Sequence, residues 1–395
     1  MKYWCGYLTA AIFAAFSWVL MQFGEKYQML VDMVYPYVTK TVQSVLSQWT
    51  SGVDFLVWQT ILVLLVVLVI GSLVVYLVCK GNLIQWLGWV LAGVSVVFFL
   101  NTAMYGLNEY AGPLTEDLRL EQRDYSTEEL TKAAAFYRDK ANELAVQLPR
   151  DEKGAAKFSD FDTLAGLTAG GFRNLTLDHS FSVYGGTYPP VKKLTWSGLF
   201  SSMGITGITV PLTGESAVNP DIPGVALPFT MARETARRMC ISRDSEAEFS
   251  AFLACEANES PEYRYSAYFM AYRYCHMVLS QIDSAAAQEL SKGCVKELTW
   301  DLNEFDQHFK SAADPTATYL ADQANTAYHT VSGTEQADSG TICDMLTAWY
   351  LENHTDLLDE PEVPKFDPFD ENQVDLSGIV NAKPRPQPEA TEGAA

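Results

Sequence analysis

Positive charge and histidine are both scarce in this chain of 395 residues. Lys and Arg number 27 against 48 Asp and Glu, so the net charge is −21. That excess argues against nucleic acid and anionic lipid as partners, because both are bound through basic side chains. No two histidines stand three or four positions apart among His179, His276, His308, His329 and His354. The sequence therefore lacks a histidine pair on one helical turn that would bind a metal.

Motifs for other chemistries are also missing. The chain has no serine in a G-x-S-x-G turn, no phosphate-binding glycine loop and no cysteine beside a catalytic partner. Seven cysteines are an odd number, which leaves at least one thiol free, and no spacing resembles a zinc ribbon. Five of them lie in the C-terminal part, where disulfides form if that part is outside the cytoplasm: Cys240, Cys255, Cys275, Cys294 and Cys343.

Charge is absent from three long runs near the N-terminus. The first lies between Lys2 and Glu25, the second runs from Phe55 to Cys79, and the third extends from Gly81 to Asn108. A bilayer core of ~30 Å requires about 20 apolar residues in a helix, and each run is long enough. The sequence thus predicts transmembrane helices at about residues 3–24, 55–79 and 82–104, within a membrane domain of residues 1–108.

The first run has an alternative interpretation as a cleaved signal peptide. A signal peptide has an apolar stretch of only ~7–15 residues, followed by a cleavage site between small residues. Here the stretch is longer and ends in Met21-Gln22-Phe23-Gly24-Glu25, which offers no such site. These differences favour a retained span.

Short-loop charges predict the orientation. Lys2 precedes the first span and Lys80 lies in the link between the second and third. Basic residues near the ends of spans stay in the cytoplasm. We therefore expect a multi-pass protein of the cell membrane, with residues 25–54 and the large C-terminal domain outside the cytoplasm.

The remainder divides into three regions. Residues 25–54 carry apolar side chains at helical spacing, which predicts an amphipathic helix on the membrane or on the outer domain, with a kink at Pro36. Residues 109–357 are predicted to form a mainly α (α+β) domain with short strands at Phe181–Tyr184 and Ile205–Val210. Ser126 and Glu129 mark a helix start in this domain. Residues 358–395 form an acidic, proline-rich tail that we expect to be disordered.

The stretch Pro228–Cys255 contains the most informative pattern, Arg233-Glu234-Thr235-Ala236-Arg237, with Glu246 on the next predicted helix. A helical zinc peptidase uses two histidines at i and i+4, a glutamate general base after the first, and a further ligand downstream. The spacing here is that of H-E-x-x-H with a downstream glutamate, but arginine stands at both histidine positions. On its own this pattern carries no weight, because any charged helix can supply it.

The chain resembles over a long stretch a bacterial multi-pass membrane family, the domain of unknown function thirty-eight ten. The matching segments are YGLNEYAGPL, STEELTKAAAFYRDKANEL, PLTGESAVNP, PFTMARETARRMCISRDSEAEFSAFLAC and YRYSAYFMAYRY, from about Tyr105 to Tyr274. The resemblance implies a zincin-like (gluzincin-like) domain after three spans. It places the general base at Glu234 and the metal ligands at Arg233, Arg237 and Glu246. It also aligns a glycine that follows the motif in the family with Cys240.

The departures from the family decide what we expect of the site. An arginine is always protonated and has no lone pair for zinc, so the zinc expected of the family should not be bound here, and no other cofactor is implied. One interpretation is an ion-pair cluster, in which Arg233 or Arg237 contacts Glu246. The alternative is that both arginines turn to solvent. In the block PLTGESAVNP we also consider four residues as candidates for binding: Thr213, Gly214, Glu215 and Asn219.

Two classes of function follow. The first is a membrane-anchored, catalytically inactive peptidase-like protein that binds an extracytoplasmic polypeptide or an envelope component. The second is an active membrane-bound peptidase that uses ligands not identified in the sequence. The pair Arg233 and Arg237 favours the first.

Overall fold

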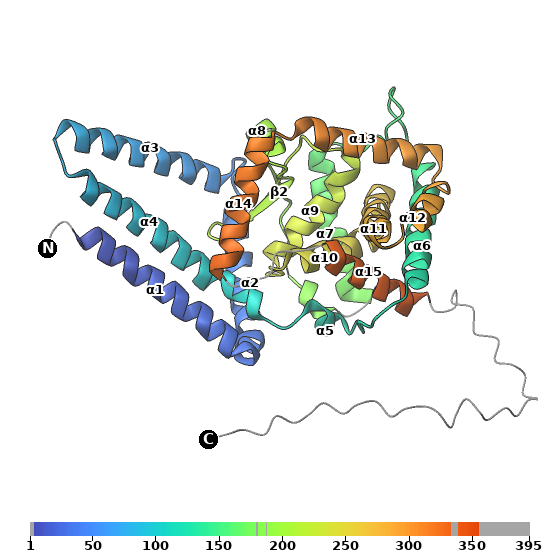
Figure 1. Ribbon diagram of the computed structural model, residues 1–395, viewed down its shortest axis with the longest axis horizontal. Coiled ribbons are helices and arrows are strands. Elements are labelled where there is room, and N and C mark those ends of the chain that lie inside the picture. Colours follow the sequence, from blue (N-terminus) through green and yellow to red (C-terminus); the bar gives the residue numbers. More distant parts are fainter. Residues whose placement is uncertain (1–3, 179–180, 187, 333–338, 355–395) are drawn as a thin grey trace, which may run out of the picture. The chain divides into compact units, whose positions relative to one another are not determined.

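The computed structural model describes residues 4–178, 181–186, 188–332 and 339–354. The fold is mainly helical, with a small three-stranded sheet (Figure 1). The predicted tail, residues 358–395, lies outside the described residues. The five cysteines of the domain, Cys240, Cys255, Cys275, Cys294 and Cys343, form no disulfides.

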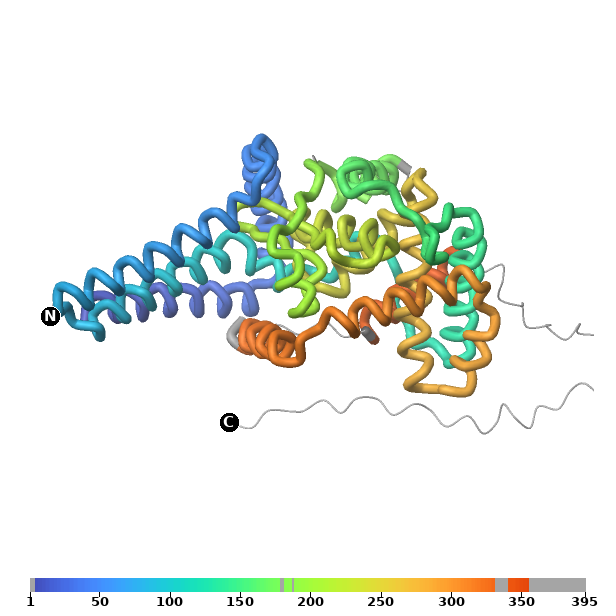
Figure 2. The backbone as a smooth tube through the Cα atoms, turned by 90° about the horizontal axis from the view of Figure 1, so that it is seen from above, coloured from blue at the N-terminus to red at the C-terminus, as the bar shows by residue number. Residues whose placement is uncertain are grey.

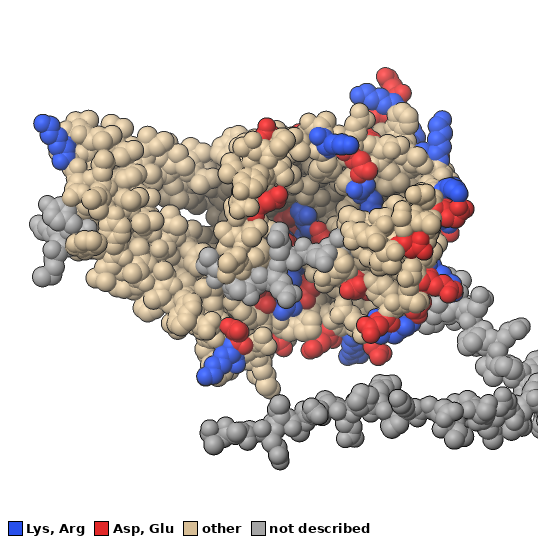
Figure 3. Space-filling model, viewed as in Figure 1, with Lys and Arg blue, Asp and Glu red and all other residues tan. Residues whose placement is uncertain are grey.

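Three helices near the N-terminus are long and apolar enough to cross a membrane, as the uncharged runs predict. They are α1 (Cys5–Lys26), α3 (Val57–Val78) and α4 (Leu83–Met104). Their surface is almost free of charged side chains, which gather instead over the domain that follows (Figure 3). Apolar side chains left exposed on such helices are stabilised by lipid, so the chain is a candidate multi-pass membrane protein.

Helices α1 and α4 pack side by side and run in the same direction (Figures 1 and 2). Near their N-terminal ends, Tyr7 Oη donates to the carbonyl of Ile84 at 2.8 Å. A Cβ on Gly6 would come within 2.5 Å of the Gly88 carbonyl carbon, so only glycine permits this approach. The start of α1 and the α3–α4 link therefore lie at one end of the bundle.

Helix α2 (Gln28–Ser51) lies against the domain through a polar face. Tyr35 Oη donates to the carbonyl of Ala103 at the end of α4 (2.8 Å), and Gln43 Nε2 donates to the carbonyl of Pro211 (2.9 Å). The opposite face is apolar and exposed, with Met29, Leu30, Met33, Val34, Tyr37, Val38, Val45 and Trp49. The predicted amphipathic helix thus exists, and its apolar face remains free for the bilayer.

The domain is built from short and medium helices. The segment after α4 forms η2 (Gly106–Tyr110) and α5 (Leu114–Leu118). Next come α6 (Thr127–Ala145), α7 (Phe161–Asp178), α8 (Ser197–Ser202), η4 (Gly224–Ala226), α9 (Leu227–Arg238) and α10 (Asp244–Glu256). The last are α11 (Pro261–Ile282), α12 (Ser284–Ser291), α13 (Lys296–Ala312), α14 (Pro315–Ser332) and α15 (Ser339–Asn353). Ser126 and Glu129 form the predicted capping box of α6.

The core of the domain surrounds α11, which packs against α6, α10 and α15. Its tyrosine stripe is part of this core, since Tyr265, Tyr268 and Tyr272 are all buried. Tyr137 of α6 and Phe252 of α10 meet edge to face between these helices. The apolar spacing that predicts the helices therefore also supplies the core.

The sheet has the order β1 (Lys192–Lys193), β3 (Glu215–Val218), β2 (Gly207–Val210). β1 runs parallel to β3, whereas β2 is antiparallel to β3 and forms an edge. The strand predicted at Ile205–Val210 is confirmed as β2. The strand predicted at Phe181–Tyr184 is wrong, because Ser182–Tyr184 is the 3₁₀ turn η3. Tyr184 of this turn is buried against Phe172.

Candidate functional site

Helix α9 carries the R-E-x-x-R pattern and packs directly on the sheet. Pro228 stands in its first turn, where the missing N–H costs no helical hydrogen bond. Glu234 is 1% exposed and faces β2, where Thr209 Oγ1 donates to its Oε2 at 2.8 Å. A Cβ on Gly207 would lie 2.7 Å from Cγ of Glu234, so the close approach of β2 requires glycine at that position. The predicted general-base residue thus lies beside an edge strand.

Arg233 lies over Glu234 and does not turn to solvent. Its Nε and Nη2 donate to Oε1 of Glu234 at 3.0 and 2.8 Å, and Nη2 also donates to Thr206 Oγ1 at 3.0 Å. Its Nη1 lies 3.9 Å from Oε1 of Glu248 on α10. Burial raises the pKa of Glu248, and the charge of Arg233 and a hydrogen bond with Tyr274 oppose that rise. Arg233 therefore joins two carboxylates from two helices.

Arg237 pairs with Asp244 at the start of α10. It lies four residues after Arg233 on α9, and Asp244 lies four residues before Glu248 on α10. Positions four apart share one face of a helix, so two arginines of α9 meet two carboxylates of α10. We call Arg233, Arg237, Asp244 and Glu248 the ion-pair ladder.

Glu246 lies outside this ladder, and the prediction that Arg233 or Arg237 contacts it is wrong. Its Oε1 accepts from Arg243 Nη1 at 2.8 Å and from the backbone N–H of Leu114 at 3.0 Å. The physical reason is helical phase: residues two apart on a helix face in very different directions, so Glu246 turns away where Glu248 faces α9. The sequence signal that locates the ladder is the matched i,i+4 spacing of its two halves.

The four candidate binding residues make structural contacts: Thr213 and Gly214 in the turn between β2 and β3, Glu215 at the start of β3, and Asn219 just after it. Glu215 accepts from the backbone N–H of Val57 and Trp58 at 3.0 and 2.9 Å and pairs with Lys192, so it caps the start of α3. Asn219 is buried and donates to Ser201 Oγ at 3.0 Å.

Thr213 and Gly214 lie in the turn that joins β2 to β3. Thr213 Oγ1 donates to the carbonyl of Val210 at 3.3 Å, and Gly214 has a φ of +66°. A Cβ on Gly214 would lie 2.7 Å from the Leu46 Cβ of α2, so this turn positions α2 on the sheet. Glu215 and Gly214 therefore hold α3 and α2 against the domain, whereas the bonds of Thr213 and Asn219 lie within the domain.

The donor set does not fit the zinc ion that the resemblance implies. Both positions that should supply imidazole supply guanidinium, which has no free lone pair. Within the described part of the chain, no three residues of the metal-binding types His, Cys, Asp and Glu are grouped so that they could hold an ion. The carboxylates that remain near Glu234 are engaged with arginine.

One comparison with known proteins gives a match. A family model described as a protein of unknown function, DUF3810, matches residues 31–336. The chain belongs to the DUF3810 family. No curated protein and no solved structure matches the chain. In this DUF3810 protein the matched region extends from within α2 to the end of α14, and thus includes both the ion-pair ladder and the contacts of α2 with the domain.

Proposed function

We propose that this DUF3810 protein is a membrane-anchored, catalytically inactive relative of the zinc peptidases that binds an extracytoplasmic polypeptide. The observation that carries the proposal is the placement of Glu234 on α9 beside the edge strand β2, with arginine at both ligand positions. A zincin has the same general arrangement of a site helix beneath an edge strand. The ladder then supplies the two positive charges that a Zn²⁺ ion would supply.

The hydrogen bonds of Glu234 support the absence of catalysis. A general base must reach the water that it deprotonates. Here one carboxylate oxygen accepts twice from Arg233 and the other accepts from Thr209. With both oxygens occupied and no Lewis-acid ligand set nearby, Glu234 acts as a structural anion that fixes Arg233.

The edge strand supports binding. β2 pairs with β3 on one side, and within the described residues the sheet ends there. An extended polypeptide can add to such an edge through main-chain hydrogen bonds, with its side chains selected by neighbouring pockets. With Lys80 on the cytoplasmic side, the domain and β2 face outside the cytoplasm, where the polypeptide or another envelope component is met.

The second candidate is an active peptidase whose ligands lie elsewhere. Glu234 favours it, because the carboxylate is retained at the general-base position. It requires ligands beyond those that the described residues bring together.

The test combines metal content, hydrolysis and binding on the full chain in mild detergent. We expect the wild type to contain no stoichiometric zinc and to bind unfolded casein without cleaving it. Arg233→His with Arg237→His restores two imidazoles beside Glu234 and Glu248, and we expect it to take up one zinc ion. Adding Glu248→Gln should weaken that uptake, whereas adding Glu246→Gln should not. Casein cleavage by the wild type that a chelator stops would establish the second candidate instead.

A further inference from the structure

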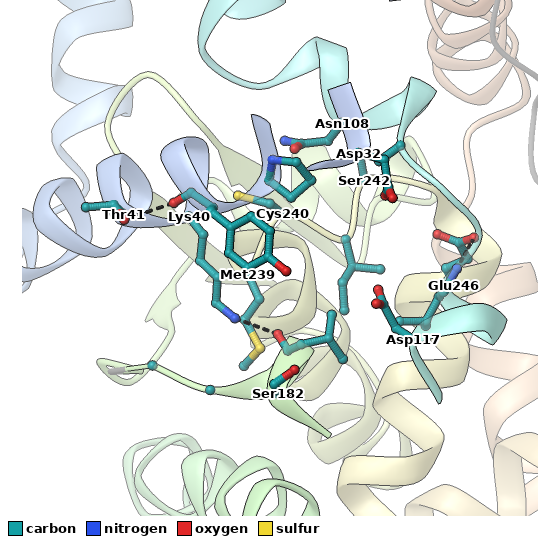
Figure 4. A pocket seen from close by; sticks show the side chains of 18 of the residues that line it. Asp32, Lys40, Thr41, Asn108, Asp117, Ser182, Met239, Cys240, Ser242 and Glu246 are labelled. Carbon is teal, nitrogen blue, oxygen red and sulfur yellow. Dashed lines mark hydrogen bonds between the residues drawn. The ribbon is translucent and has the colours of Figure 1, made fainter. Parts of the chain in front are cut away.

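A second site lies between α2, the segment that follows α4, and the turn that follows α9. It is an open cavity of about 620 Å³, lined among others by Asp32, Tyr37, Lys40, Asp117 and Glu246 (Figure 4). Cavities of about 300–1,000 Å³ hold small ligands in proteins. None of the ladder residues lines the cavity, so its function is a separate question from the proposed peptide binding.

The cavity lies beside the C-terminal end of α4, where that candidate span would leave the membrane. Tyr35 of α2 donates to the carbonyl of Ala103, one residue before the end of α4, and Asp32 accepts from the backbone N–H of Gly112 at 3.0 Å. Helix α2 itself begins two residues after α1 ends. Tyr37 and Val45 belong both to the cavity lining and to the exposed apolar face of α2. An occupant of the cavity can therefore extend an apolar portion along α2 into lipid.

The cavity presents opposite charges on its two sides. On one side Lys40 Nζ donates to the carbonyl of Val183 at 2.6 Å and has donors left over. Asp32 and Asp117 lie across from it (Figure 4). Burial lowers the pKa of Lys40, while burial and the neighbouring charges of Asp32 and Glu246 raise the pKa of Asp117. Lys40 would thus be stabilised by an anion and Asp117 by a cation.

We propose that this cavity binds the phosphoethanolamine headgroup of a bilayer phospholipid. The phosphate lies against Lys40, the primary ammonium donates to Asp32 and Asp117, and the acyl chains follow the outward face of α2. A purely anionic headgroup meets the carboxylates without a compensating cation. A choline headgroup has no N–H to donate to them. The zwitterion with a primary amine satisfies both sides.

The experiment is a lipid titration of the full chain in detergent, followed by native mass spectrometry. The probes are dioctanoyl phosphatidylethanolamine, the matching phosphatidylglycerol and phosphatidylcholine, and glycerophosphoethanolamine, which lacks acyl chains. We expect phosphatidylethanolamine to bind about tenfold more tightly than phosphatidylglycerol and phosphatidylcholine, since neither of these can make the charge-assisted hydrogen bonds to Asp32 and Asp117 and such a bond contributes about that factor. Glycerophosphoethanolamine should also bind more weakly, because it lacks the apolar contact with α2. Asp117→Asn and Lys40→Gln should each remove about tenfold of that affinity.

Controls separate the headgroup contacts from general effects. Two exposed residues outside the cavity serve as controls: Lys292 pairs with Glu289, and Asp162 pairs with Lys193. The variants Lys292→Gln and Asp162→Asn should therefore bind phosphatidylethanolamine as tightly as the wild type does. Lys40→Arg keeps the charge and should retain affinity even if Lys40→Gln folds poorly. Equal affinity for phosphatidylethanolamine and phosphatidylglycerol, or unchanged binding by Asp117→Asn, overturns the proposal. So does equally tight binding of glycerophosphoethanolamine, which would point to a soluble ligand.

Discussion

At the residue scale, the ladder shows how two guanidiniums occupy a site suited in spacing to two imidazoles. Arginine is longer than histidine and carries its charge at the tip, so each one reaches across to α10. Together with Glu234, which also binds Arg233, the ladder forms a cluster in which each guanidinium faces at least one carboxylate. Such a cluster costs little only while each charge keeps a partner, because an unpaired charge in a protein interior is strongly destabilising.

Removal of Glu234 tests that dependence. Glu234→Ala leaves Arg233 with only the more distant Glu248, and loss of one partner of a buried pair costs about 3–5 kcal/mol. We expect a value in the lower part of that range, measured by chemical unfolding in detergent. The matched control is Glu289→Ala, which breaks the fully solvated pair with Lys292 and should cost ~0–1 kcal/mol. Equal effects of the two changes would show that Arg233 turns to solvent.

The raised pKa of Glu248 predicts a dependence of stability on pH. A carboxyl group whose pKa is higher in the folded state than its ordinary value of 4.5 binds more protons when folded. The contribution of Glu248 to stability is therefore full below about pH 4.5 and falls as the pH rises through its folded pKa. Glu248→Gln mimics the protonated form, so it should gain in melting temperature relative to the wild type between pH 4.5 and pH 7. A constant difference over that range would contradict the assignment.

At the scale of elements, the sequence predicts what depends on local pattern. The uncharged runs locate the three candidate spans, the spacing of apolar side chains locates α2 and the helices of the domain, and Ser126 marks the start of α6. Which carboxylate faces α9 depends instead on the rotation of α10 about its axis. Alignment with the family selects Glu246 and so misses this rotation. The i,i+4 spacing of Asp244 and Glu248, which matches that of Arg233 and Arg237, indicates that Glu248 faces α9.

The strands, too, can be predicted where they depend on local sequence and not where they depend on tertiary contacts. β2 has enough β-branched residues to be recognised, with Ile208, Thr209 and Val210 in succession. β1 is only two residues long, and β3 includes Glu215, whose burial depends on contacts with α3 and Lys192 that are distant in sequence. The segment Phe181–Tyr184 predicts a strand because it is rich in aromatic and β-branched residues, but only Tyr184 among them is buried and the segment forms a turn. Tertiary contacts decide each of these cases.

Helix α2 gives a prediction at this scale. Its exposed face should lie in the lipid interface, because Met33 and Trp49 are 60% and 76% exposed on one apolar face. A nitroxide on Met33→Cys, in a variant with the accessible cysteines replaced by serine, should collide more with oxygen than with a polar nickel complex in vesicles. The same label on Glu289→Cys, at a solvated surface, should show the reverse. Similar accessibilities at the two positions would place α2 in water.

At the scale of the whole molecule, the parallel packing of α1 and α4 determines which parts share a side of the membrane. Because α1 and α4 run in the same direction, the start of α1 and the α3–α4 link lie together, and the end of α4 leads into the domain at the opposite end. Two native thiols lie at the first end, Cys5 at the start of α1 and Cys79 just after α3. Labelling of these two thiols shows which side of the membrane this end faces, and it requires no introduced cysteine.

The last prediction is the orientation itself. Because Lys80 lies beside Cys79 and basic residues near the ends of spans stay in the cytoplasm, we expect this end to be cytoplasmic. A membrane-impermeant maleimide should therefore leave Cys5 and Cys79 unmodified in intact cells and label them after permeabilisation. Glu289→Cys, on the exposed surface of the domain, should be labelled in intact cells. If Cys79 reacted in intact cells and residue 289 did not, the domain would be cytoplasmic. The binding of extracytoplasmic polypeptides would then be excluded, whereas the phospholipid site, which needs only a membrane surface, would not be.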